Sequence, residues 1–205
     1  MEEQIRFAAG SIILEGLVSL PEPAALTGVV VCHPHPLYGG EMHNNVVEAM
    51  VIALRRAGHA TLRFNFRGVG GSSGVHGEGV AEIDDVKAAV TYLLQQQAFD
   101  TIVVAGYSFG SIVGMRAGAD DPRVAKLIGV ALPIATRDAS FLEDIAKPKL
   151  LISGDRDDHS PVAGLKALSS RLAKPTQLVI IERADHFFRR REVEVSDAVL
   201  KFIDQ

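Results

Sequence analysis

The stretch Gly106-Tyr107-Ser108-Phe109-Gly110 decides the fold of this 205-residue chain. It follows the apolar run 101–105 and precedes the mainly apolar run 111–117. This order predicts a strand, a sharp turn and a helix, in which the strained serine holds its hydroxyl clear of the backbone and the small flanking residues let strand and helix pass closely. Ser108 is therefore the candidate nucleophile.

The same Gly-x-Ser-x-Gly pattern occurs a second time, at Gly70-Gly71-Ser72-Ser73-Gly74. That segment is rich in glycine and no helical pattern follows it directly, so it is predicted to be a loop. A short motif is confirmed by its structural context, and only the match around Ser108 lies between a strand pattern and a helix pattern.

The rest of the chain alternates between short apolar runs and amphipathic runs. Strands are expected at 28–32, 60–66, 124–132, 149–153 and 177–181, of which 28–32, 124–132 and 149–153 have the pattern of buried strands, and helices are expected at about 44–56, 78–97, 161–172 and 195–203. Residues 4–7 and 12–20 are expected to form an antiparallel edge. This alternation predicts an α/β protein, with one domain over residues 1–205 and a mostly parallel sheet covered by helices on both faces.

Composition narrows the possible functions. The net charge of −4 gives no electrostatic reason to expect nucleic acid or an anionic membrane as a partner, so a small-molecule substrate is expected. Cys32 is the only cysteine, which leaves no intrachain disulfide. The acidic start and the absence of a long apolar stretch favour a cytoplasmic protein. Nothing in the sequence predicts an oligomeric state.

A serine hydroxyl needs an imidazole to take its proton and a carboxylate to hold that imidazole in the right tautomer. Suitable groups follow Ser108 in the chain. An aspartate cluster at 155–158 comes after the predicted strand 149–153, and His186 comes after the predicted strand 177–181. Open α/β sheets place their sites at such carboxyl ends of strands.

With these residues, the sequence resembles the α/β-hydrolase superfamily, and more narrowly its small dienelactone-hydrolase-like members. The resemblance covers nearly the whole chain, and its matching stretches are 33–40 (HPHPLYGG), 63–70 (RFNFRGVG), 106–110, 154–161 and 184–188 (ADHFF). It implies an α/β-hydrolase fold and a serine hydrolase that acts on carboxylic esters or related acyl substrates, with Ser108 as nucleophile, His186 as general base and no cofactor.

The acid of this arrangement has three candidates in the sequence. The family's Gly-x-x-Asp-x-x-x-Pro arrangement, matched here by Gly154 and Pro161, implies that Asp157 holds the histidine. Asp155 and Asp158 remain alternatives, since turns favour aspartate for local hydrogen bonding in any case.

An oxyanion hole requires backbone donors near the nucleophile. One is expected to be the N–H of Phe109, the residue after Ser108. The second is expected from the loop after Cys32, where Pro34 and Pro36 have no N–H to offer. Leu37 is favoured there, with His35 as the next choice.

The segment 133–147, where many relatives insert a cap domain, holds only about fifteen residues. We therefore expect no large cap and an open site for small or exposed acyl groups, because long lipid chains need more apolar cover.

Two alternatives remain from the sequence. The pair His33 and His35 at a strand end could bind a metal in a metal-dependent hydrolase. A hydrolase fold that has lost its chemistry could also serve as a binding protein.

Overall fold

The structure is a computed structural model that describes residues 1–205. Its strands are β1 (Glu3–Ala9), β2 (Ile12–Ser19), β3 (Thr27–Cys32), β4 (Ala60–Phe64), β5 (Thr101–Tyr107), β6 (Lys126–Val130), β7 (Lys149–Gly154) and β8 (Thr176–Ile181). Its helices are α1 (Asn45–Arg56), α2 (Glu82–Gln96), α3 (Phe109–Ala119), α4 (Val162–Arg171) and α5 (Glu192–Ile203), with short 3-10 turns η1 (Pro36–Tyr38) and η2 (Ser140–Leu142).

All eight strands belong to one sheet, in the order β1-β2-β4-β3-β5-β6-β7-β8. The pairs β1–β2 and β2–β4 are antiparallel, and every pair from β4–β3 to β7–β8 is parallel. The predicted mostly parallel sheet with an antiparallel N-terminal edge is therefore confirmed. Because β3 and β5 to β8 run in the same direction, their carboxyl ends meet at one edge of the sheet.

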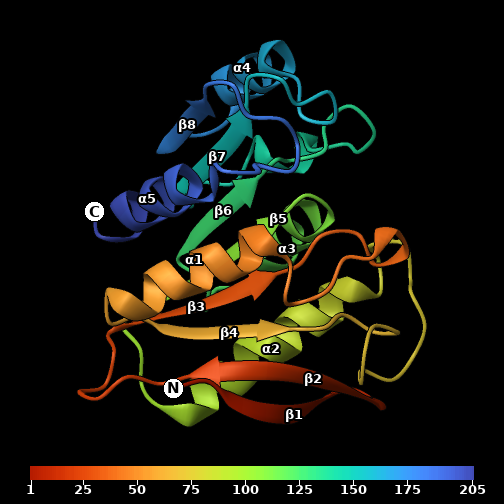
Figure 1. Cartoon of the computed structure of the whole chain (residues 1–205), viewed down its shortest axis with the longest axis vertical. Helices are drawn as coiled ribbons and strands as arrows, with labels where there is room; N and C mark the ends of the chain where they lie inside the picture. Colours follow the sequence, from red (N-terminus) through yellow and green to blue (C-terminus); the bar gives the residue numbers. More distant parts are fainter.

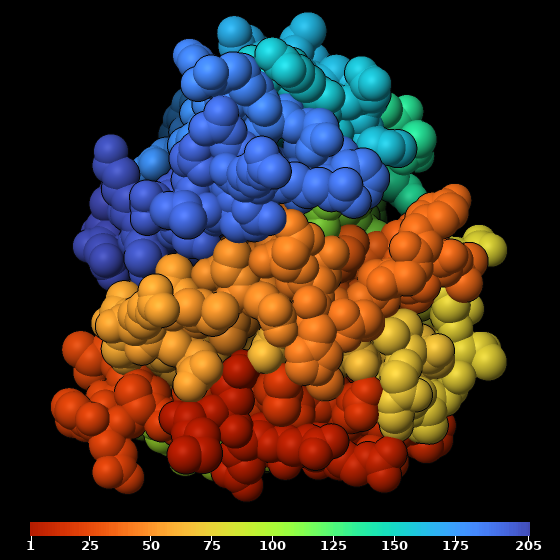
Figure 2. All heavy atoms as spheres, in the orientation of Figure 1, coloured from red at the N-terminus to blue at the C-terminus, as the bar shows by residue number.

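Helices cover both faces of the sheet (Figure 1). Alternate side chains of one strand point to opposite faces, so Val103 and Ala105 of β5 face α1 and α5, whereas Ile102 and Val104 face α2 and α3. Two separate apolar cores result, one on each side. Figure 2 views the face on which α1 and α5 lie side by side.

One predicted boundary is wrong in an instructive way. The amphipathic pattern predicts a helix from about residue 78, but α2 begins at Glu82. The buried Glu82 carboxylate accepts the backbone N–H groups of Gly77 and Gly79, at 2.6 and 2.8 Å, and residues 78–81 form turns before the helix. Gly79 has φ +90°, a conformation that residues with a side chain rarely adopt, so the chain turns here before the helix begins.

The segment between β6 and β7 contains only η2, so no cap domain covers the carboxyl edge of the sheet. None of the helices combines the length and apolarity needed to span a bilayer. The loops at the carboxyl edge therefore form the surroundings of Ser108.

Candidate active site

Ser108 lies in the sharp turn between β5 and α3. Its backbone has φ 54° and ψ −119°, a region that residues with a side chain rarely adopt. The turn is held by the Ser108 N–H, which donates to the Val130 carbonyl of β6 at 2.8 Å, and by the Ser111 N–H, which donates to the Ser108 carbonyl at 2.9 Å. The strain is thus fixed by bonds from the neighbouring strand and the following helix.

The glycines on either side of Ser108 permit this turn. A Cβ at Gly106 would collide with the Gly110 carbonyl, and a Cβ at Gly110 would collide with the carbonyl oxygens of His33 and Cys32, the latter at 2.5 Å. Both obstacles are backbone atoms, which cannot rotate away. The two glycines therefore let α3 start directly against the ends of β3 and β5.

We expect Gly110→Ala to lower the free energy of unfolding by about 3 kcal/mol, because α3 must move away from the β3 end. For a chain of this size that lowers the melting temperature by roughly 10 °C.

Gly114→Ala, one turn later in α3, is the control. Its Cβ would meet Val104 Cγ1 at 3.1 Å and Cys32 Sγ at 3.4 Å. These side-chain atoms can shift, and alanine favours the helix, so we expect a change within about 1 kcal/mol. Equal melting temperatures for the two variants, measured by calorimetry, would contradict the account.

The structure brings Ser108, His186 and Asp157 together at the carboxyl edge of the sheet. Ser108 Oγ lies 2.9 Å from His186 Nε2, and His186 Nδ1 lies 2.9 and 3.0 Å from the two oxygens of Asp157. Asp157 Oδ1 also accepts the backbone N–H groups of His159 and Ser160, at 2.9 and 3.0 Å. These donors stabilise an ionised carboxylate, which in turn favours a proton on His186 Nδ1 and leaves Nε2 free to accept from the serine.

Of the three aspartates in the cluster, only Asp157 contacts His186. Its side chain is fully buried, whereas Asp155 and Asp158 are exposed. The buried position follows from the turn after β7, in which the Asp157 carboxylate binds the backbone of the next residues.

Two residues outside the predicted site, Tyr107 and His159, contact His186. The Tyr107 hydroxyl donates to the His186 carbonyl at 2.8 Å, and the His159 ring centroid lies 4.6 Å from that of His186. Burial, with the nearby charges of Asp157 and Asp185, raises the pKa of Tyr107, so its hydroxyl keeps the proton that it donates. Tyr107 could have been suspected as a polar tip at the end of an otherwise apolar strand.

The expected oxyanion donors lie in different surroundings. Phe109 is the first residue of α3, so its N–H has no partner within the helix and points from the positive end of the helix dipole. The N–H of Leu37 donates to His35 Nδ1 at 3.2 Å, and its side chain is 71% exposed. Leu37 does not line the cavity at Ser108, whereas His35 does.

The loop 36–40 has its remaining backbone donors engaged. The N–H groups of Tyr38 and Gly40 donate to the His35 carbonyl, and that of Gly39 donates to the Pro36 carbonyl. The His35 N–H has no acceptor in the protein. It is thus the N–H of this turn that is available to a ligand.

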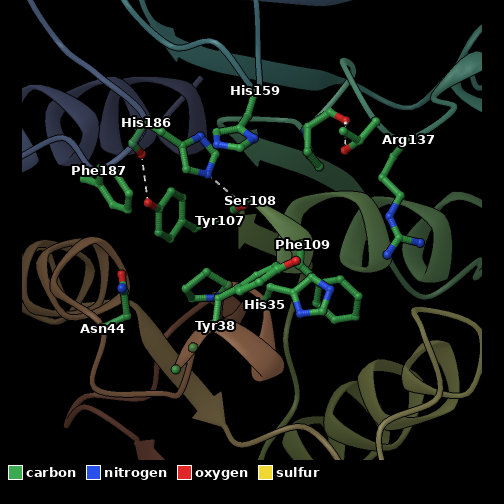
Figure 3. Close-up of a pocket in the computed structure, with 15 residues that line it drawn as sticks. His35, Tyr38, Asn44, Tyr107, Ser108, Phe109, Arg137, His159, His186 and Phe187 are labelled. Carbon is green, nitrogen blue, oxygen red and sulfur yellow. Dashed lines mark hydrogen bonds between the residues drawn. The ribbon is translucent and has the colours of Figure 1, made fainter.

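A cavity of about 500 Å³ opens at Ser108. Figure 3 shows His186 and His159 on one side of it, with Tyr38, His35 and Phe109 opposite, and Ser108 between them. The segment between β6 and β7 contributes Pro133, Thr136 and Arg137 to the cavity wall, and η2 is its only helical element.

His33 does not face this cavity as a metal ligand would. Its Nε2 accepts the Phe66 N–H at 3.0 Å, and its Nδ1 lies 2.7 Å from the Pro34 carbonyl, so both ring nitrogens are engaged. Burial lowers the pKa of His33 to about 4, which keeps the ring neutral. Nowhere does the chain gather three histidine, cysteine or acidic side chains in a ligand arrangement.

Comparison with known proteins places these features in context. A family model described as the alpha/beta hydrolase fold matches residues 29–140. An uncharacterized protein from Rickettsia prowazekii is 35% identical over 183 residues, which cover 85% of this chain and 77% of that protein. A solved alpha-beta serine hydrolase homologue from Coxiella burnetii is 35% identical, with a TM-score of 0.89 over 97% of this chain and 96% of that one. A serine hydrolase without lid from Xanthomonas campestris is 33% identical, with a TM-score of 0.88, and the match covers 99% of this chain and 94% of that one.

Proposed function

This chain belongs to the α/β-hydrolase fold family, and from that premise we propose that it is a serine hydrolase of small carboxylic esters or related acyl compounds. The observation that carries the proposal is the continuous hydrogen-bonded line from Ser108 Oγ through His186 to the buried Asp157. A structural histidine would not need a nucleophile on one ring nitrogen and a buried carboxylate on the other.

In the proposed reaction, Ser108 Oγ attacks the acyl carbon while His186 Nε2 takes the hydroxyl proton. The charge that develops on the carbonyl oxygen is held by the N–H groups of Phe109 and His35, since these donors are free and border the cavity. His186 then gives its proton to the leaving alcohol, and an acyl group remains on Ser108. Water, with its proton passing to His186, releases the acid and restores the serine.

The open cavity favours substrates whose acyl group is small or projects into solvent. A volume of about 500 Å³ holds a ligand of modest size, and no cap supplies the apolar cover that a long acyl chain requires. The expectation of small acyl groups rests on this absence of cover.

The proposal is tested by a fluorophosphonate together with p-nitrophenyl esters of rising chain length. We expect the phosphonate to lose fluoride and to add to Ser108, as peptide mass spectrometry would show. We also expect higher kcat/KM for acetate and butyrate esters than for palmitate, because the longer chain stays in water.

A protein that carries no phosphonate on Ser108 at any pH from 6 to 9 would instead support a binding function on the same fold. Preference for the palmitate ester would contradict the open site, and loss of activity with a chelator would favour the metal-dependent alternative.

A further inference from the structure

The cavity at Ser108 has an unbalanced charge. Of its 15 lining residues, Arg137 is the only lysine or arginine, and none is an aspartate or glutamate. Asp157 is buried behind His186 and does not line the cavity. The chain as a whole has a net charge of −4, so this positive pocket differs in sign from the average surface.

Arg137 is held at the cavity without a neutralising partner. Its Nη1 donates to the Glu78 carbonyl at 3.1 Å, and its guanidinium carbon lies 5.9 Å from the ring centroid of Phe109. It takes part in no ion pair, in contrast to Arg63 and Arg67, whose guanidinium groups meet carboxylates at 2.9 and 2.6 Å. The remaining N–H groups of Arg137 are thus free to bind a ligand.

The backbone that carries Arg137 is fixed. Its own N–H donates to the Pro133 carbonyl at 2.9 Å, and the Ala135 N–H donates to the carbonyl of His159 at 3.1 Å. This turn lies between β6 and η2, in the segment that leads to β7. Figure 3 shows Arg137 at one end of the cavity, with Asn44 at the other end and Ser108 between them. The turn thus fixes the backbone of Arg137, and its contacts with the Glu78 carbonyl and the Phe109 ring hold the guanidinium in the same cavity as Ser108.

The charge of Arg137 reaches His35 in the cavity wall. Partial burial lowers the pKa of His35, and the charges of His76 and Arg137 lower it further, against the opposing effect of the Glu82 carboxylate, which is paired with His76. His35 is thus neutral at neutral pH, and Arg137 supplies a lasting positive charge to the cavity. An anionic ligand would remove this uncompensated charge.

We propose that Arg137 determines specificity and that the preferred substrates are esters that carry a carboxylate in addition to the scissile acyl group. The proposal rests on the proposed function. A planar guanidinium with several free N–H groups can bind a carboxylate through two parallel hydrogen bonds, which a lysine cannot match. The partly enclosed position strengthens such a pair relative to one in open water.

The test compares two pairs of esters, each an anion and its methyl ester. The first is p-nitrophenyl hydrogen adipate, with its charge on the acyl side. The second is p-acetoxybenzoate, with its charge on the leaving group. We expect Arg137→Gln to lower kcat/KM for at least one of the anions by about 10- to 100-fold. Its methyl ester should change by less than about threefold, and Arg137→Lys should lie between wild type and Arg137→Gln.

Arg189→Gln is the matched control, because it removes the same charge from an exposed arginine beside Phe187 that does not line the cavity. We expect less than about threefold change for either anion, since an exposed charge is screened by salt. Equal losses for both arginine variants, or equal losses for an anion and its methyl ester, would overturn the role of Arg137.

A binding measurement separates this proposal from the proposed function. In the Ser108→Ala background, calorimetry should show tighter binding of the preferred anion than of its methyl ester, and Arg137→Gln should abolish that difference. If the wild-type protein hydrolyses no ester, the proposed function fails while this measurement still decides the role of Arg137. Equal affinity for an anion and its methyl ester in both pairs overturns the anionic preference.

Discussion

We expect Ser108→Ala to lower kcat for the hydrolysis of p-nitrophenyl acetate by at least about 10⁴-fold, because the proposed reaction loses its nucleophile. What remains would come from water attack on an ester held by the oxyanion donors. The substitution removes one oxygen and retains the turn, so we expect the melting temperature to change little. Steady-state kinetics and calorimetry on the same preparation measure both quantities.

Ser72→Ala provides the matched control, since it makes the same chemical change in the other Gly-x-Ser-x-Gly segment. The Ser72 hydroxyl donates to the Asn65 carbonyl at 2.7 Å and accepts the Glu15 N–H at 3.0 Å, so it supports the loop after β4. Its loss should cost about 1–2 kcal/mol of stability and leave kcat within about threefold of wild type. An active Ser108→Ala protein would remove the basis of the proposed mechanism.

Adding a second substitution tests whether Ser108 and His186 act as a unit. We expect Ser108→Ala with His186→Ala to be no slower than Ser108→Ala alone, because a base without its nucleophile contributes nothing. A further large loss in the double variant would indicate that His186 has a separate role.

Asp157→Asn is the second substitution with a large expected effect, a loss of about 10³- to 10⁴-fold in kcat. The asparagine oxygen can still accept the N–H groups of His159 and Ser160, so the turn is preserved. Its amide then donates to His186 Nδ1, which moves the ring proton to Nε2. A protonated Nε2 cannot accept the proton of Ser108.

Asp158→Asn removes the neighbouring exposed carboxylate and serves as the control, with kcat expected within about threefold of wild type. The fluorophosphonate labelling rate gives a second measure, since it depends on the same activated serine. If Asp158→Asn were the more damaging substitution, the assignment of Asp157 would be overturned.

The overall fold could be predicted from the sequence because its signals are local. Apolar runs such as 101–105 mark strands buried on both faces, and Gly106 and Gly110 mark a close passage of backbones. The order of strands along the sheet depends on long-range pairing, and periodicity carries no information about which strand lies beside β3. That order comes from the structure.

The site was only partly accessible from the sequence. Ser108, Asp157 and His186 follow strand ends in a recognisable order, and the structure brings them together. The role of Leu37 was predicted from proline positions alone, which do not reveal that its N–H turns back to His35. No sequence pattern identifies Arg137 as a site residue. Its position can be interpreted only once the structure shows that it lines the cavity and has no acidic partner.

The three side chains at the centre of the site are contributed by segments far apart in the chain, since Ser108 and His186 are separated by 78 positions. His186 lies in the loop after β8, which is the last strand at one edge of the sheet, whereas Ser108 directly follows β5 in the middle of the sheet. Bringing two residues so far apart in the chain into contact costs loop-closure entropy, and this cost must be met before Ser108 and His186 can form a site. Until β8 has joined the sheet, the loop that carries His186 is not fixed opposite Ser108, so the site requires the complete sheet.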